Sequence, residues 1–530
     1  MKNITMQRWL SLLLIVMLVV LAGCQPVNGV DLNKLIESSS SVKTSQGTQT
    51  ITFDLIRNAS VKPSEEQQKM LDLFGNVKLS ITDMKQQDLT HLSVKGTFEY
   101  AKGKIPFQIV MSDQQYIIQV EGAKKPIVLH NSGGASMEQL QSTLSKEMQE
   151  QLKQLQKKAE QMAPTFVTYF GTKLPNPKTV SITDSKQTIN NESLNLKQVH
   201  VEVKGDELLG LVKGFLTNLL ADEKGMKELI GQLYDLVLPL AQQAMKESKA
   251  QNQENPMDEM IAPYLNNKTL AVEFAYTFLQ TNLKKTLDNY DQSVQEALSS
   301  PAGSSLRELL SEKNYLKLDL YVDSDLIPRK SYMELLVNFP TTGEESVTGM
   351  KVTSTSEVWN INKPVTADTI DVSGGKLELE SLNKPGKVLQ ALDSKSKLYE
   401  LLKSDLHITK KEINMFMDDS EDIYADSVKP YNRNGVVMVP ARFVVEQLDA
   451  DVTWDAATQQ VSIVDSINGT VIKLNIGSKQ ASVNGMIKPL EAEAELTNGS
   501  TFVPVRFIAE NMGAVVSWDQ ELQMVTITRD

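Results

Sequence analysis

Few side chains in this 530-residue sequence have types and spacings suited to catalysis or metal binding. Cys24 is the single cysteine, so the sequence offers no disulfide and no cysteine metal site. The four histidines are His91, His130, His200 and His407. They are far apart in the sequence, whereas zinc and copper sites gather several such ligands. No nucleophile elbow, zinc-protease helix, phosphate-binding loop or dinucleotide-binding glycine pattern occurs. We therefore expect a non-enzymatic protein without a cofactor or bound metal.

Carboxylates leave one alternative open. Asp418, Asp419, Glu421 and Asp422 form an acidic run that could hold calcium, but the run lacks the spacing and the glycine of an EF-hand. We interpret it as a solvated linker. Two carboxylates that meet only in the folded chain would leave no local pattern, so an enzyme or a sensor partner remains the third hypothesis.

The chemistry that Cys24 can do is set by what precedes it. Lys2 and Arg8 give a positive start, and residues 9–20 are apolar apart from one serine, which is the length of a signal-peptide core. Leu21-Ala22-Gly23-Cys24 then resembles the bacterial lipobox. The resemblance implies that residues 1–23 are removed and that Cys24 carries a diacylglycerol. Two acyl chains give stable anchoring, so we expect a lipoprotein on the extracytoplasmic face of the cell membrane. An ordinary signal peptide with a chance cysteine is the alternative.

The charge and composition narrow the choice of partners. The net charge of −12 and the absence of a basic stripe argue against nucleic acid as a partner.

Residues 24–45 are rich in Ser, Asn and Gln and are interpreted as a tether behind the lipidated cysteine.

The C-terminal part contains two near-copies of one stretch, 64 residues apart. MVPARFVVEQLDADVTWD ends at Asp455, and FVPVRFIAENMGAVVSWD ends at Asp519. The matched positions include Pro440, Arg442, Phe443, Trp454 and Asp455 in the first copy and Pro504, Arg506, Phe507, Trp518 and Asp519 in the second. Each unit is predicted to be strand–helix–strand–strand, and one unit alone is too small to bury its apolar face.

Each repeated residue has a structural interpretation. The prolines suit the first helical position, and the arginines suit i,i+4 pairs with Glu446 and Glu510 on the solvent side. The aspartates can bond their own turn. The tryptophans are expected to fill the core, although stacking on glycan is an alternative. Asn484-Gly485 predicts a hairpin turn between the copies.

The paired Val-Pro-x-Arg-Phe and Trp-Asp motifs resemble the copper amine oxidase N-terminal-like domain, a stalk-type module, over roughly residues 414–530. The resemblance implies a cell-envelope-associated module. It implies no redox activity, because the copper chemistry of those oxidases lies in another domain and the repeat contains no histidine. A cell-wall polymer is a possible partner of this module.

The middle of the chain, residues 46–370, predicts a large antiparallel sheet with helices. Strand-like runs separated by turn signals predict strands at residues 49–58, 76–83, 90–100, 105–112, 115–121, 178–189, 194–204, 317–322, 330–339 and 349–360. In residues 90–100, Leu92, Val94 and Phe98 alternate with polar residues, which suits a half-buried antiparallel sheet. Leucine-rich periodicity predicts helices at 137–162, 207–220 and 226–245. The strict alternation from Leu270 to Phe278 predicts a further strand. Residues 371–413 are predicted to be a helical connector.

Two short motifs in this region resemble LolA/LppX-type lipoproteins: residues 321–330, an aspartate-rich turn followed by Pro328 and Arg329, and residues 361–365. The resemblance implies a curved antiparallel sheet that holds helices on its concave side and, in many members, a lipid between them. The expected fold class is therefore α+β, with a small duplicated domain at the C-terminus. Whether residues 46–370 form one domain or two is left open.

The first functional hypothesis is a lipid-anchored protein that binds a lipid or hydrophobic ligand, with Phe215, Leu219, Leu233 and Leu236 lining its site. The alternative is a structural or adhesion-like protein of the cell wall that binds protein or glycan. An apolar ligand site would distinguish the first, and a filled core with an exposed patch the second.

Overall fold

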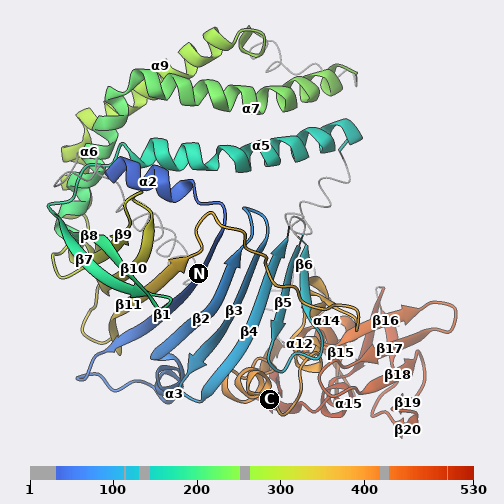
Figure 1. Cartoon of the computed structure of the whole chain (residues 1–530). Helices are drawn as coiled ribbons and strands as arrows, with labels where there is room; N and C mark the ends of the chain where they lie inside the picture. Colours follow the sequence, from blue (N-terminus) through green and yellow to red (C-terminus); the bar gives the residue numbers. More distant parts are fainter. Residues whose placement is uncertain are drawn as a thin grey trace. The chain divides into compact units, whose positions relative to one another are not determined.

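The computed structural model (Figure 1) describes residues 32–112, 115–130, 144–250, 263–301, 303–417, 429–497 and 499–529. These residues form a mixed α+β fold with a large curved sheet and several helices, which confirms the predicted class. They divide into two compact units, the described parts of Met1–Gln115 with His130–Thr369, and Tyr116–Leu129 with Ile370–Asp530. The predicted leader, Cys24 and the acidic run that begins at Asp418 lie outside the described residues.

In the first unit, long antiparallel strands follow the order β4-β3-β2-β1-β11-β10-β9-β8-β7. They are β1 (Ser45–Arg57), β2 (Asn76–Gln86), β3 (Leu92–Tyr100), β4 (Gly103–Ser112), β7 (Thr179–Ile189), β8 (Glu192–Lys204), β9 (Tyr315–Val322), β10 (Pro328–Asn338) and β11 (Val347–Trp359). Each overlaps a strand that was predicted from the sequence. The sequence did not show that β1 and β11, about 300 residues apart, would pair from Gln46↔Trp359 to Arg57↔Val347 at the centre of the sheet.

The strand registers give this sheet one apolar and one polar face. Directly paired residues share a face, and alternate residues along a strand return to it. Phe53 pairs with Val77 and Val352, and Leu79 pairs with Phe98, which pairs with Ile105. The same face continues through Leu335, Leu316, Val203 and their alternating neighbours as far as Val180 and Ile182 on β7. The opposite face carries Thr, Lys, Glu and Asp side chains.

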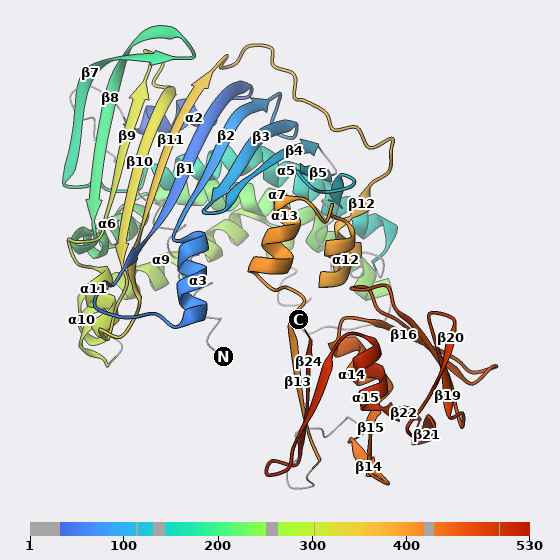
Figure 2. The ribbon, with the colours of Figure 1, turned by 90° about the horizontal axis from the view of Figure 1, so that it is seen from below.

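Helices occupy the apolar side of the sheet. Figures 1 and 2 show α2, α5, α7 and α9 on one side. The helices of this unit are α2 (Leu32–Ser40), α3 (Glu65–Phe74), α5 (Lys146–Gly171), α6 (Leu208–Ala221), α7 (Glu223–Ala250), α9 (Lys268–Asp288), α10 (Tyr290–Ser299) and α11 (Gly303–Leu309). Leu35 of α2 and Leu211 of α6 pack against Val199, Val201 and Val203, so these two helices cover the β7–β9 part of the face.

The helices also have a core of their own. Leu219 of α6, Met226 of α7 and Tyr276 of α9 are buried together, with Tyr169 of α5 packed against them. Burial raises the pKa of the Tyr169 hydroxyl to about 12. Helix α5 begins at Lys146 and continues nine residues past the predicted end at Met162; the predicted part from Met137 to residue 143 lies outside the described residues.

The prediction of a strand from Leu270 to Phe278 is wrong, because this segment lies inside the helix α9. Tyr276 is 5% exposed against α7, whereas Phe274 and Phe278 are 57% and 62% exposed. The helix is apolar on its packed face and also on its outer face. Apolar residues on both faces, interleaved with small and polar residues, imitate the alternation of a strand.

In the second unit, β12 (Leu377–Glu378), β6 (Ile127–His130) and β5 (Gln115–Val120) are neighbours. The connector then forms α12 (Pro385–Gln390), which Pro385 opens as predicted, α13 (Lys397–Glu400) and a π-helical turn from Leu401 to Asp405. The connector is packed onto the C-terminal module, because Lys384 Nζ donates to the carbonyl of Ala450 (2.8 Å) and Gln390 Nε2 to that of Ser466 (2.6 Å).

The C-terminal module consists of three small sheets around one large buried cluster and a smaller one that includes Met438 and Phe502. The strands are β13 (Lys411–Phe416), β14 (Tyr431–Arg433), β15 (Val436–Pro440), β16 (Asp451–Asp455), β17 (Gln460–Val464), β18 (Val471–Asn475), β19 (Gln480–Val483), β20 (Met486–Pro489), β21 (Glu495–Thr497), β22 (Ser500–Pro504), β23 (Val515–Asp519) and β24 (Met524–Arg529). The helices are α14 (Ala441–Gln447) and α15 (Val505–Asn511). Both copies are strand–helix–strand–strand, and their apolar residues share one buried cluster, as predicted. Asn484 and Gly485 both have positive φ, as the predicted hairpin turn requires.

No helix among the described residues is both long enough and apolar enough to span a bilayer.

The polar face of the large sheet predicts a pH-dependent stability. Glu334 accepts hydrogen bonds from the hydroxyls of Tyr315 and Tyr332 (2.8 Å each) and lies 3.0 Å from Lys351 Nζ. The Tyr315 bond is the main cause that lowers the pKa of Glu334 from 4.5 to about 2. Since the pKa is depressed on folding, this stabilisation is present above pH 4.5 and is lost as the pH falls toward 2. Glu334→Gln should therefore cost more stability at pH 7 than at pH 3, measured by urea unfolding.

Glu312→Gln, at an exposed site just before β9, serves as the control and should change the free energy of unfolding by less than about 0.5 kcal/mol at either pH. An equal loss for Glu334→Gln at both pH values would contradict the assigned role of the ionised carboxylate.

Candidate ligand-binding face

The apolar face of β1–β4 is the first candidate site. The helices α2 and α6 bury the β7–β9 half of this face. On β1–β4, Ile105 is also buried, but several of its apolar neighbours retain contact with solvent. Phe53 is 43% exposed, and Ile51, Leu79, Phe98 and Phe107 are half-buried. A sheet normally packs one face fully against a second layer, so an apolar face that remains partly open favours the binding of an apolar partner.

Aromatic side chains pack closely along this face and cover one end of it. The Phe107 ring lies over Gly96, where a Cβ atom would come within 2.6 Å of Phe107 Cζ and 2.7 Å of the Ser80 carbonyl oxygen. Glycine is therefore required at position 96. At the end of β3, Tyr100 is buried and its ring stacks with those of Phe98 and Phe74, with centroids 6.1 Å apart in each pair. The resulting surface offers hydrocarbon contact.

The four residues predicted to line a ligand site are not gathered on this face. Phe215 and Leu219 pack into the α6–α7–α9 core, where Leu219 is 7% exposed. Leu236 of α7 is also buried, whereas Leu233 is 38% exposed on the same helix. Their sequence signal was dense leucine periodicity, and in the structure that periodicity serves helix packing. The residues that sequence reasoning did not assign to the site, Phe53, Leu79 and Phe98, lie on strands that it did predict.

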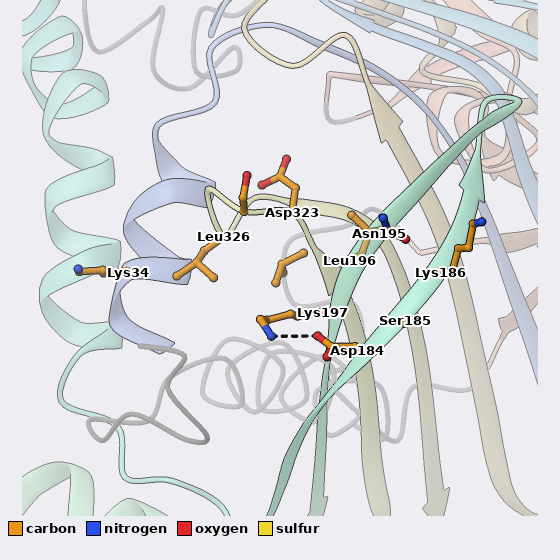
Figure 3. Close-up of a pocket in the computed structure, with 11 residues that line it drawn as sticks. Lys34, Asp184, Ser185, Lys186, Asn195, Leu196, Lys197, Asp323 and Leu326 are labelled. Carbon is orange, nitrogen blue, oxygen red and sulfur yellow. Dashed lines mark hydrogen bonds and ion pairs between the residues drawn. The ribbon is translucent and has the colours of Figure 1, made fainter.

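A separate cavity of about 780 Å³ lies where the β7–β8 hairpin and the β9–β10 turn approach α2 (Figure 3). Its lining includes Lys34, Lys186, Leu326 and an ion pair between Lys197 and Asp184, with a distance of 3.0 Å from Nζ to Oδ1. Its lining mixes these charged side chains with the apolar Leu196, Val322 and Leu326. None of the four predicted ligand residues lines it.

The motif that resembles LolA/LppX-type proteins forms the turn at the edge of this cavity. Asp323 Oδ1 accepts hydrogen bonds from the backbone amides of Asp325 and Ile327 (3.1 Å each). Leu326 has φ of +59°, and Arg329 Nη1 lies 3.6 Å from Asp323 Oδ2. Turn formation therefore accounts for the residue types of this motif.

The repeated residues of the C-terminal module hold matching positions in both copies. Pro440 and Pro504 end a strand and precede the helix, one residue before the predicted helical position. Phe507 is buried in the shared core and Phe443 packs against it. Arg442 pairs with Glu446 (3.3 Å) and Arg506 with Glu510 (3.8 Å) on the exposed helix faces, as predicted.

The two aspartates of the Trp-Asp motif organise equivalent turns, which confirms their predicted role. Asp455 Oδ1 accepts from the amides of Ala457 (2.9 Å) and Thr458 (3.4 Å). Asp519 Oδ1 accepts from those of Glu521 (2.9 Å) and Leu522 (3.0 Å). Hydrogen bonds from Thr458 and Ala457 lower the pKa of Asp455.

The prediction that Trp454 and Trp518 fill the core is wrong. Their side chains are 39% and 42% exposed, and they lie on β16 and β23, which are edge strands of their sheets. An edge strand has a neighbour on only one side, so a large side chain near its end is covered only in part. The module thus presents two equivalent aromatic surfaces.

A buried ion pair joins the two copies. Arg529 is 3% exposed and Asp465 is fully buried, and the Arg529 guanidinium donates to both Asp465 Oδ2 and the Leu448 carbonyl. These two residues are 64 positions apart, so they are equivalent positions of the repeat that contact one another. Val439 and Val503, also equivalent, pair directly between β15 and β22.

Comparison with known proteins gives two matches, both partial. The family model of the copper amine oxidase N-terminal domain matches residues 418–527, which supports the predicted identity of the C-terminal module. A curated protein from Brevibacillus choshinensis named "Protease inhibitor" is 36% identical over 81 residues, which are 15% of this chain. The match covers 24% of that protein, so the chain spans about a quarter of its length. No solved structure matches the chain.

The buried pair between the copies yields a stability prediction. Asp465→Asn leaves a buried guanidinium without its counter-charge, which should cost about 3–5 kcal/mol of module stability. Urea unfolding followed by tryptophan fluorescence would measure the loss in a Trp359→Phe background, because Trp454 and Trp518 lie in this module whereas Trp359 lies on β11 of the first unit.

Arg442→Ala is the matched control, because it removes a solvent-exposed i,i+4 pair and should change stability by no more than about 0.5 kcal/mol. A loss below about 1 kcal/mol for Asp465→Asn would show that the two copies do not depend on the buried pair.

Proposed function

We propose that this protein is a membrane-anchored extracytoplasmic lipoprotein that binds a lipid or another hydrophobic ligand on the open apolar face of its large sheet. The observation that carries the proposal is the contrast within one face. The β7–β9 half is buried under α2 and α6, whereas Phe53, Leu79 and Phe98 on the other half remain partly exposed.

The energetics favour an apolar occupant. Removing apolar surface from water gains about 25 cal/mol per Å², so an acyl chain laid on this face would be stabilised without any directed contact. Between Ile51 and Leu55 of β1, and along the matching positions of β2, β3 and β4, the face consists of apolar side chains and glycine. The resemblance of Leu21-Ala22-Gly23-Cys24 to a lipobox supports the location, because it implies that the protein is held beside a bilayer.

In this proposal the protein is not an enzyme. The family match supports this part, because the copper amine oxidase N-terminal domain is separate from the catalytic copper domain of those oxidases. Within the described residues, no group of three or more His, Cys, Asp or Glu side chains is arranged to hold a metal ion. The C-terminal module would then serve to position the sheet within the cell envelope.

Native mass spectrometry tests the ligand. The chain from Gln25 to Asp530, which lacks the lipidated cysteine, should carry an extra mass when purified from a bacterial host and lose it on organic extraction. Phe53→Asp should reduce the bound fraction at least tenfold, because it places a charge among hydrocarbon contacts. Thr52→Asp, the neighbouring position on the polar face, is the matched control and should bind as the unaltered chain does.

Two outcomes would count against the proposal: an apo mass from lipid-rich cells that persists after incubation with lipid vesicles, or an equal loss of ligand in both variants.

A second candidate function rests on Trp454 and Trp518. Half-exposed aromatic rings can stack on sugar faces, and the repeat presents two in equivalent positions. The module would then bind a cell-wall glycan, and the protein would act as a structural or adhesion-like component of the wall.

Sedimentation with purified cell-wall polymer measures this second function. Trp454→Ala with Trp518→Ala should abolish co-sedimentation, while Leu496→Ala, at another exposed apolar position of the module, should leave it intact. Undiminished sedimentation of the double variant would exclude these rings as the glycan contact.

A further inference from the structure

A belt of uncharged polar side chains crosses the apolar face near one end of its central strands. It consists of Gln49 on β1, Ser354 and Ser356 on β11, and Ser331 on β10. The registers put all four on the apolar face, because Gln49 pairs with Ser356, Ser356 pairs with Ser331, and Ser354 lies opposite Ile51. The belt is therefore continuous across three neighbouring strands.

The belt residues bond to one another and still have donors to spare. The hydroxyls of Ser331 and Ser356 lie 2.7 Å apart, and Gln49 Nε2 donates to Ser354 Oγ at 3.1 Å. Two hydroxyls that share one bond leave one hydroxyl hydrogen free, and Ser354 accepts through its oxygen while its own hydrogen remains available. Gln49, Ser331 and Ser356 are half-buried rather than fully covered, so a ligand on this face can reach them.

The residues around the belt favour a ligand whose hydrogen-bond acceptor is uncharged. Next to the belt, the face is lined by Ile51, Met333 and Leu320, which offer no counter-charge. Arg329, two residues from Ser331, is already engaged, since Nε donates to the Val358 carbonyl (3.2 Å) and Nη1 lies 3.6 Å from Asp323. A carboxylate or phosphate on the belt would be desolvated without a counter-charge, whereas a neutral ester carbonyl needs only a hydrogen-bond donor.

We propose that the belt is the recognition site for the ester carbonyls of an acyl-ester lipid, whose hydrocarbon chains extend over Ile51, Phe53 and Leu79. The order of side chains along β1 supports this orientation, because Gln49 is followed by Ile51, Phe53 and Leu55 on the same face. This inference rests on the proposed function and specifies its ligand as an ester lipid.

Paired lipids provide the test. The chain from Gln25 to Asp530 is titrated with a diester diacyl phosphatidylcholine and with the diether analogue that has the same chains and head group. Only the diester has carbonyl acceptors. It should bind about 2- to 10-fold more tightly for each hydrogen bond formed.

Substitutions in the belt test whether these side chains cause the preference for the diester. Ser331→Ala with Ser356→Ala removes both members of a hydroxyl pair, so neither partner is left unsatisfied, and should reduce the preference for the diester without weakening the diether complex. Adding Gln49→Leu should remove it. Thr355→Ala, between the two β11 serines and on the polar face, is the matched control and should keep the full preference.

Equal affinity for diester and diether would overturn the belt assignment and leave the hydrophobic site in place. A preference that survives in the triple variant would also overturn it. If neither lipid binds, the proposed function itself fails.

Discussion

The structure of the first unit depends on one constraint: a sheet with one apolar face must cover that face. The registers align Phe53, Val352 and Leu335 and continue the same face to Ile182 on β7, so the covering has to extend across the whole sheet. The helices α2 and α6 do this over β7–β9, where Val199 and Val203 are almost fully buried. Over β1–β4 the face stays half-open, which is why we propose this part of the sheet as the binding surface.

The opposite face of the sheet is polar and carries cross-strand ion pairs. Lys330 pairs with Glu357 (3.1 Å), Lys351 with Glu334 (3.0 Å), and His200 Nδ1 lies 2.7 Å from Asp319. Such pairs add little stability when exposed, but they hold polar side chains in cross-strand order and keep this face unsuited to apolar partners. A hydrophobic ligand therefore has one side of the sheet available to it.

The sequence predicted the strands well, because alternation is a local property that Leu92, Val94 and Phe98 display within one segment. It could not predict which strands pair. The pairing of β1 with β11, and the belt formed by Gln49, Ser331 and Ser356, therefore could not be predicted from the sequence. It misled at α9, where Phe274 and Phe278 on the outer face and Tyr276 on the packed face imitate a strand. It also misled at Trp454, because burial depends on whether the strand has a second neighbour.

The C-terminal module shows why a duplicated sequence must diverge at certain positions. When two copies pack around a shared axis, equivalent residues near that axis meet one another. Two identical apolar residues can pack against each other there, as Val439 and Val503 do. Two identical charged residues cannot meet in this way, because two aspartates or two arginines in a fully buried site would repel each other without solvent to screen them. The repeat carries Asp465 in one copy and Arg529 in the other, and these two form the buried pair. A mismatch between the copies is therefore itself a structural signal: opposite charges at equivalent positions indicate where the two halves touch.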